Sequence, residues 1–247
     1  AKGHVDAMRQ LLDEGAEVDR ADKNGVTPLL VACLNGHVDA ARLLLDKGAD
    51  VDRAVEDGGT PLLIACQQGH VDAARLLLNN GAEVDRANKD GWTPLWIACH
   101  EGHVAVVRLL LDHGADVNRA DEGGETPLYT ACEEGHLDAA RLLLEKGAEV
   151  DRALMDGRTP LYLACDEGRV DAVRLLLENG AEVNRADGYG YTPLFVACGQ
   201  GNVDVARLLL DKGAEVNRAD EDGETPLDIA KHQGHSSLVA LLAEHRN

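Results

Sequence analysis

The sequence repeats itself every 33 residues. All seven prolines lie in the tripeptide Thr-Pro-Leu, and its threonines carry the period: Thr27, Thr60, Thr93, Thr126, Thr159, Thr192 and Thr225. The six cysteines and several glycines keep the same spacing. A constant period of this length is typical of a solenoid, in which each repeat packs only against its neighbours. The period therefore predicts one array of stacked units, although a length of 247 residues would also allow one or two globular domains.

One repeat can be interpreted residue by residue. Thr60 is a good N-cap, and Pro61 at the first helical position has no N–H to leave unpaired. These signals predict a short helix over 62–68, and the next apolar segment predicts a second helix over 71–79. The polar stretch 85–91 contains an Asp-Gly turn signal. Each repeat should therefore be two helices joined by a turn, followed by a protruding hairpin-like loop.

These segments resemble ankyrin repeats. TPLLVAC, TPLWIAC and TPLYLAC are similar to the family's Thr-Pro-Leu-His-x-Ala stretch, and GHVDAARLLL with GAEVDRA is similar to its second helix and outgoing loop. The resemblance covers nearly the whole chain, but the family's usual His after Thr-Pro-Leu is missing and its second Ala is Cys in six copies. It implies an all-α solenoid whose loop tips and first helices line a concave groove used for partners.

The repeat boundaries divide the chain evenly. We expect a single ankyrin-repeat domain over 1–247, with a partial repeat at 1–21, six full repeats over 22–219 and a capping repeat over 220–247. Polar replacements in the last repeat suit a terminal cap: Lys231 takes the position of the cysteines and Asp228 that of the aromatics. The start within a repeat leaves open whether the chain is a fragment.

The cysteines and histidines follow the repeat rather than a ligand geometry. Equivalent atoms of adjacent repeats should lie ~8–10 Å apart, whereas a disulfide needs Cα atoms within about 7 Å. We therefore expect the cysteines to be small core residues, which indicates a reducing, cytoplasmic location. Six histidines share one position before the second helix, where Arg169 and Asn202 also occur, so this is a turn-stabilising polar site. No metal or other cofactor is expected.

Catalytic and nucleic-acid functions find no support in the sequence. No nucleophile lies beside a matching base, and no Gly-rich phosphate loop is present, so the chain is not expected to be an enzyme. The net charge of −20 disfavours binding to nucleic acid or to an anionic membrane surface. No apolar run approaches the roughly 18 residues of a membrane span. A monomer that binds proteins is the expectation that remains.

The residues that vary between repeats predict a partner-binding surface. All seven aromatics lie at variable positions, which we expect on loop tips and on the exposed side of the first helices. Carboxylates gather there too: 35 loop and turn positions hold 14 acidic and three basic residues. The candidate partner-binding residues are Trp92, Trp96, His100, Glu125, Tyr129, Glu133, Arg158, Tyr162, Asp166, Tyr189, Tyr191 and Phe195.

We therefore expect a non-catalytic module that binds a protein or peptide, preferably a basic one, by cation–π contacts and charge attraction. Two alternatives stay open. The aromatics could pack against the loops as structural filler in place of the family's histidine. The array could also be a structural spacer or an engineered scaffold without a selected ligand, because near-identical repeats fit consensus design as well as duplication.

Overall fold

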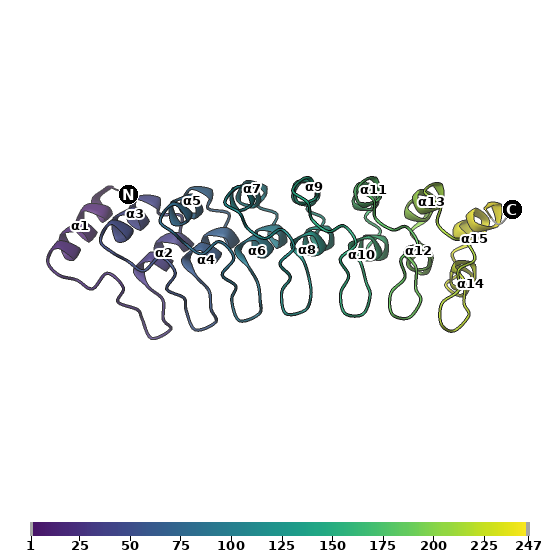
Figure 1. The fold of residues 1–247 in the computed structure, drawn as a ribbon, viewed down its shortest axis with the longest axis horizontal. Coiled ribbons are helices and arrows are strands. Elements are labelled where there is room, and N and C mark those ends of the chain that lie inside the picture. The colour runs from purple at the N-terminus through teal and green to yellow at the C-terminus, as the bar shows by residue number, and fades with distance from the viewer. Residues whose placement is uncertain (1, 246–247) are drawn as a thin grey trace. The chain divides into compact units, whose positions relative to one another are not determined.

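The computed structural model describes residues 2–245 and contains helices joined by turns and loops, with no strand in that range (Figure 1). It divides into two compact units, Ala1–Glu122 and Gly123–Asn247. The helices of the first unit are α1 (Lys2–Asp13), α2 (Pro28–Leu34), α3 (Val38–Asp46), α4 (Pro61–Gln67), α5 (Val71–Asn79), α6 (Pro94–His100) and α7 (Val104–Asp112). Those of the second are α8 (Pro127–Glu134), α9 (Leu137–Glu145), α10 (Pro160–Asp166), α11 (Val170–Glu178), α12 (Pro193–Gln200), α13 (Val203–Asp211), α14 (Pro226–His232) and α15 (Ser236–Glu244).

The predicted helix pair is present in every full repeat. In each unit the first helices of successive repeats pack against one another and against the second helix of their own repeat, as in α4 with α6 and with α5. This arrangement gives two rows of helices, and the loops extend on the side of the first-helix row (Figure 1). The helix bounds agree with the prediction within one residue, since the helix expected over 62–68 spans Pro61–Gln67.

The repeated threonine and proline start each first helix. In α6 the Thr93 hydroxyl accepts a hydrogen bond from the backbone N–H of Trp96 (3.1 Å), and Pro94 fills the first helical position. Of the N–H groups that a helix start leaves unpaired, one is therefore capped by Thr93 and another is absent at Pro94. In α14 a capping box adds to this, because the Asp228 carboxylate accepts a hydrogen bond from the backbone N–H of Thr225 (3.2 Å).

The core of each unit consists of leucine, alanine and cysteine side chains. Leu95, Cys99 and Leu110 are fully buried, as are their equivalents in the other full repeats. The prediction that the cysteines are small core residues is confirmed, because all six are buried. Burial raises the pKa of the Cys33 and Cys198 thiols to about 12.

The loops are hairpin-like, although they form no assigned strands. In the loop before α12, the N–H of Asp187 donates to the carbonyl of Tyr191 (3.1 Å). The next residue, Gly188, donates its N–H to the carbonyl of Asp156 in the preceding loop (2.7 Å). Backbone hydrogen bonds thus join the two limbs of one loop and also join successive loops.

A ladder of side-chain acceptors also connects successive repeats. Both carboxylate oxygens of Asp85 accept the backbone N–H of Asp116, at 3.2 and 3.1 Å. Asp151 accepts the N–H of Glu182 in the same way, and Asn184 accepts that of Glu215. The repeated hydrogen bonds of this ladder come from the Asp or Asn, and Arg218 adds one by donating from Nη1 to the carbonyl of Asn184 (3.0 Å).

The repeated histidine acts between repeats rather than within its turn. His103 Nε2 donates to the carbonyl of Gln67 (3.1 Å), at the end of the first helix of the preceding repeat, and makes no side-chain cap bond to its own helix. Gly69 makes room for the ring, because a Cβ there would lie 2.7 Å from His103 Cε1. Asn202 Nδ2 makes the corresponding contact with the carbonyl of Asp166 (3.3 Å) and a second one with the carbonyl of Cys165 (3.0 Å).

Candidate functional site: loop tips and first helices

Three variable positions of each repeat form a column along its loop and first helix. They are the residue before the repeated threonine and the residues three and seven after it. Spacing by four residues places the two helical positions on one face of the helix. In the third full repeat the column consists of Trp92, Trp96 and His100.

In this column the aromatic rings stack on one another. The ring centroids of Trp92 and Trp96 lie 4.9 Å apart with 2° between their planes. His100 stacks on Trp96 with a centroid distance of 5.3 Å and an angle of 18°. Trp96 is therefore enclosed, with 4% of its surface exposed, whereas Trp92 and His100 are half-buried.

The prediction that the helical aromatics are exposed is wrong for three of them. Trp96, Tyr129 and Phe195 are buried, and Tyr162 is half-buried. The physical reason is clearest where the residue four positions earlier is also aromatic, because its ring folds back from the loop and covers the ring on the helix. The alternative that the aromatics pack against the loops is confirmed for Trp96 and Phe195.

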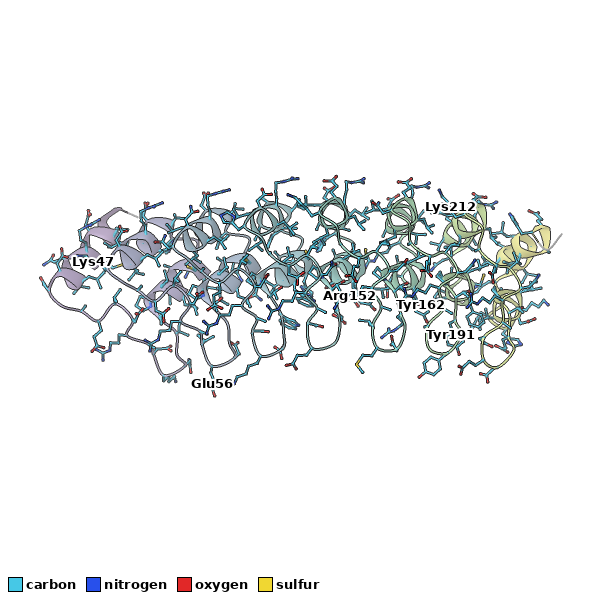
Figure 2. The ribbon with its side chains drawn as sticks, in the orientation of Figure 1. Lys47, Glu56, Arg152, Tyr162, Tyr191 and Lys212 are labelled. Atoms are coloured by element: carbon cyan, nitrogen blue, oxygen red, sulfur yellow. The ribbon has the colours of Figure 1, made fainter. Side chains whose placement is uncertain are left out.

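The second unit has an exposed aromatic edge on the loop before α12. Tyr191 stacks on Phe195 with centroids 4.8 Å apart, and Tyr189 tilts against Tyr191 at 6.0 Å. Tyr189 remains 62% exposed. Asp187 Oδ1 fixes this loop by accepting the backbone N–H groups of Tyr189 and Tyr191, both at 2.9 Å. Figure 2 shows Tyr191 on the loop side of the unit and Lys212 on the opposite side.

Arg158 lies near two tyrosines and pairs with a carboxylate. Its Nε donates to Asp156 Oδ2 (2.7 Å), and its charge also interacts with the hydroxyls of Tyr129 and Tyr162. Burial raises the pKa of Tyr129 to about 12. Burial, followed by the Asp187 and Asp166 carboxylates, raises the pKa of Tyr162 further. Both phenols are therefore neutral at physiological pH.

Carboxylates surround the aromatic side chains of the second unit. Burial is the first cause of the raised pKa of Tyr191, and negative charge on four carboxylates adds to it: Asp220, Asp222, Asp187 and Glu224. Glu133 and Glu125 act on Tyr129 in the same direction. These interactions are consistent with the negative potential expected from the sequence.

The candidate residues separate into two groups, one in each unit. Trp92, Trp96 and His100 belong to the first unit, where they form one stack. The second unit holds Glu125, Tyr129, Glu133, Arg158, Tyr162, Asp166, Tyr189, Tyr191 and Phe195. Two further residues matter here but were not predicted from the sequence: Met155, which is 98% exposed at a loop tip, and Asp187, which fixes the loop of Tyr189. An apolar residue at a loop position that is polar or Gly elsewhere was the available signal for Met155.

No resident metal centre is evident among residues 2–245, where no group of three His, Cys, Asp or Glu side chains is arranged to hold an ion. Within the same range, none of the helices is both long enough and apolar enough to cross a bilayer. The candidate residues themselves supply aromatic rings, carboxylates, the Arg158 guanidinium and the His100 imidazole.

Two rows of short helices with projecting loops define a helical repeat protein, and comparison with known proteins shows its family. The pattern described as Ankyrin repeats (3 copies) matches residues 1–88, 52–121, 82–153 and 120–187, and Ankyrin repeats (many copies) matches 176–230. The chain therefore belongs to the ankyrin repeat family, which confirms the resemblance seen in the sequence. Ankyrin repeats generally mediate protein–protein interactions and are typically non-catalytic.

Among solved structures, the chain is similar to the ankyrin repeat domain of human ASB11. The two are 36% identical, and the TM-score is 0.79. The similarity covers 87% of this chain and 97% of that domain. The search of curated proteins gave no match.

Proposed function

We propose that this chain binds a protein or peptide segment rich in Lys or Arg through its loop tips. In the second unit the binding surface, named here the tip surface, is formed by Met155, Asp156, Tyr189, Tyr191, Asp222 and Glu224. The observation that carries the proposal is the exposure of Tyr189 at 62% in a loop flanked by carboxylates. Exposed tyrosine is enriched at binding hot spots.

The chemistry of the tip surface suits a cation on a flexible side chain. A neutral phenol ring attracts an ammonium or guanidinium group placed over its face, by about 0.5–1 kcal/mol at an exposed site. Nearby carboxylates add charge attraction, which also speeds association and weakens with added salt. The buried rings of Tyr129 and Phe195 support the loops and helices beneath this surface, and we do not assign them direct contact with the partner.

In the first unit we assign the corresponding role to Trp92. Its ring rests on Trp96 with one face, so that only the opposite face is available for a partner. Trp96 has Trp92 on one side and His100 on the other, which leaves it a supporting role. We extend the proposal to a non-catalytic monomer that needs no cofactor. A reducing, cytoplasmic location suits its six free thiols.

A structural scaffold without a selected ligand is the second candidate. The burial of Trp96, Tyr129 and Phe195 favours the scaffold, because three of the four aromatic residues on the first helices then serve only in packing. The two candidates differ in what they expect of the exposed residues. If the chain is a scaffold, removing the Tyr189 side chain has no effect on binding. If it is a binding module, the same change lowers its affinity for the basic ligand.

A binding titration separates them. The probe is a fluorescein-labelled acetyl-(Lys-Gly-Gly)4-amide, which is basic and flexible, and the readout is fluorescence anisotropy at 20 and 150 mM NaCl. We expect saturable binding that weakens at least ~5-fold at the higher salt. Replacing Tyr189→Ala and Asp222→Asn together should weaken it by ~10-fold.

The matched control is Asp211→Asn, which removes the same charge at the end of α13, in the second-helix row. It should change the affinity by less than 2-fold. Equal affinities for the control and the tip variants would contradict the proposed surface, and an absence of saturable binding at 20 mM NaCl would favour the scaffold.

A further inference from the structure

We infer that the preferred partner of the tip surface is a polyproline II segment with a basic residue at every third position. This inference rests on the proposed function and adds to it the conformation and the spacing of the ligand. It is based on the distance between successive loops of the second unit and on the residues that these loops expose.

The backbone hydrogen bonds set the spacing of the loops. Within one loop the N–H of Asp187 donates to the carbonyl of Tyr191 (3.1 Å), and the N–H of Glu221 in the next loop donates to the carbonyl of Tyr189 (3.1 Å). Going from one loop to the next therefore crosses two hydrogen-bonded backbone spacings. Each such spacing is about 4.8 Å, so one repeat advances by about 9.6 Å.

Among regular peptide conformations, polyproline II matches this distance best. It has three residues per turn and a rise of 3.1 Å, so equivalent side chains recur about every 9.3 Å on one side. Side chains of an extended β-strand recur on one side about every 6.8 Å. An α-helix needs two turns, about 10.8 Å, and its mismatch grows by more than 1 Å with each repeat.

The exposed residues follow the same period. Asp156, Tyr189 and Asp222 occupy the same position in three successive loops, and all three are exposed. A partner with Lys at every third residue places one ammonium group opposite each of them, as an ion pair at Asp222 and a cation–π contact at Tyr189. At Asp156 the ammonium group competes with Arg158, whose Nε donates to Asp156 Oδ2 (2.7 Å). The residues between the lysines face Tyr191 and Met155, whose apolar surfaces suit proline rings.

The test uses three peptides with equal charge. Acetyl-(Lys-Pro-Pro)4-amide has the proposed spacing and conformation. An isomer of identical composition has its four lysines adjacent and flanked by prolines, and acetyl-(Lys-Gly-Gly)4-amide has the spacing without the stiffness. We expect the first to bind at least ~10-fold more tightly than its isomer and ~3-fold more tightly than the glycine peptide. Simple charge attraction predicts the reverse order for the two isomers, because adjacent lysines concentrate the charge.

Two variants test whether the peptide preference depends on the tip surface. With Tyr189→Ala, the preference for acetyl-(Lys-Pro-Pro)4-amide over its isomer should fall below ~3-fold, while Asp211→Asn should leave it unchanged. Equal or tighter binding of the isomer to the unmodified protein overturns this inference and leaves the proposed function standing if the binding still depends on Tyr189 and on salt. If none of the three peptides binds at 20 mM NaCl, both proposals are wrong.

Discussion

The indole rings of Trp92 and Trp96 are almost parallel, with centroids 4.9 Å apart and 2° between their planes. The first comes from a loop and the second from the helix that the loop precedes. One covers the other, so two aromatic residues that look equivalent in the sequence have different environments. The structure assigns packing to Trp96, which is 4% exposed, whereas Trp92 is half-buried.

Truncating the two tryptophans should therefore have unequal effects on stability. Trp96→Ala removes a buried ring and should lower the free energy of unfolding by ~3–5 kcal/mol. Trp92→Ala removes one stacking partner and should cost about 1 kcal/mol. Urea unfolding followed by circular dichroism measures both. Equal losses of unfolding free energy in the two variants would contradict the assignment of Trp96 as the buried, supporting ring and of Trp92 as the more exposed one.

Thr130 offers a stabilising substitution in the second unit. Its hydroxyl is buried without a hydrogen-bond partner, at a position where other repeats have Val, Ile or Leu. Thr130→Val keeps the shape and removes the unsatisfied group, so the free energy of unfolding should rise by ~1 kcal/mol. The matched control is Thr126→Val at the N-cap of the same helix, where the hydroxyl accepts the N–H of Tyr129 (3.2 Å). That change should lower stability by ~1 kcal/mol; two losses in urea unfolding would contradict the account of Thr130.

The acceptor ladder should respond to pH. Burial raises the pKa of Asp151, although its hydrogen bond from the Glu182 N–H acts in the opposite direction. The folded chain thus takes up a proton at higher pH than the unfolded chain does, and the ionised carboxylate costs stability at neutral pH. Asp151→Asn keeps an acceptor, as Asn184 does naturally, and should be stabilising at pH 7.

The advantage of Asp151→Asn should shrink as the pH falls through the raised pKa of the folded chain, and it should be gone below about 3.8, where the Asp151 carboxyl is neutral in the folded and the unfolded chain. Thermal unfolding of the native protein and the variant between pH 3 and 7 checks this. The reverse change, Asn184→Asp, should be destabilising at pH 7. A variant that gains stability equally at all pH values would contradict the linkage.

The buried thiols should be protected from alkylation. Burial raises the pKa of Cys33 and Cys198 from 9.0 to about 12, so the thiolate fraction at pH 8 falls on the order of 1,000-fold. Iodoacetamide labelling followed by mass spectrometry should modify all six thiols quickly in urea and very slowly in the folded protein. Rapid labelling of the native chain would contradict their core placement.

Arg158 should weaken the binding of basic ligands. Its Nε lies 2.7 Å from Asp156 Oδ2, so it neutralises a carboxylate that a partner's lysine could otherwise use. Arg158→Gln should tighten binding of acetyl-(Lys-Gly-Gly)4-amide by ~3-fold, measured by anisotropy. Arg152→Gln changes the net charge equally but removes a residue paired with Glu149, at 3.9 Å, and should have a smaller effect. Equal gains would mean that only net charge matters.

Local signals were sufficient to predict the fold. The N-cap Thr93 and Pro94 define where a helix begins, and the regular glycines define the turns, because these effects act within a few residues. The 33-residue period then implies the stacking of the repeats. The hydrogen bond from the Glu182 N–H to Asp151 was not predictable in the same way, since it joins residues 31 apart and depends on how neighbouring loops meet.

The candidate site was predicted less completely. Placing Trp96 and Phe195 at variable positions was correct, but position alone does not show that a loop ring folds back to cover each of them. Whether Tyr189 or Tyr191 remains exposed depends on the conformation that Asp187 imposes on the loop. Whether one ring covers another depends on tertiary packing, and comparing the repeats within the sequence does not reveal it.

Amide chemical-shift mapping can locate where a basic partner binds. If it binds at the loop tips of the second unit, titration of the isotope-labelled protein with acetyl-(Lys-Pro-Pro)4-amide should give the largest shift changes at residues 155–158, 187–191 and 220–224, with little change in α11 and α13. Shift changes concentrated in those two second helices, or none at saturating peptide, would contradict binding at the loop tips.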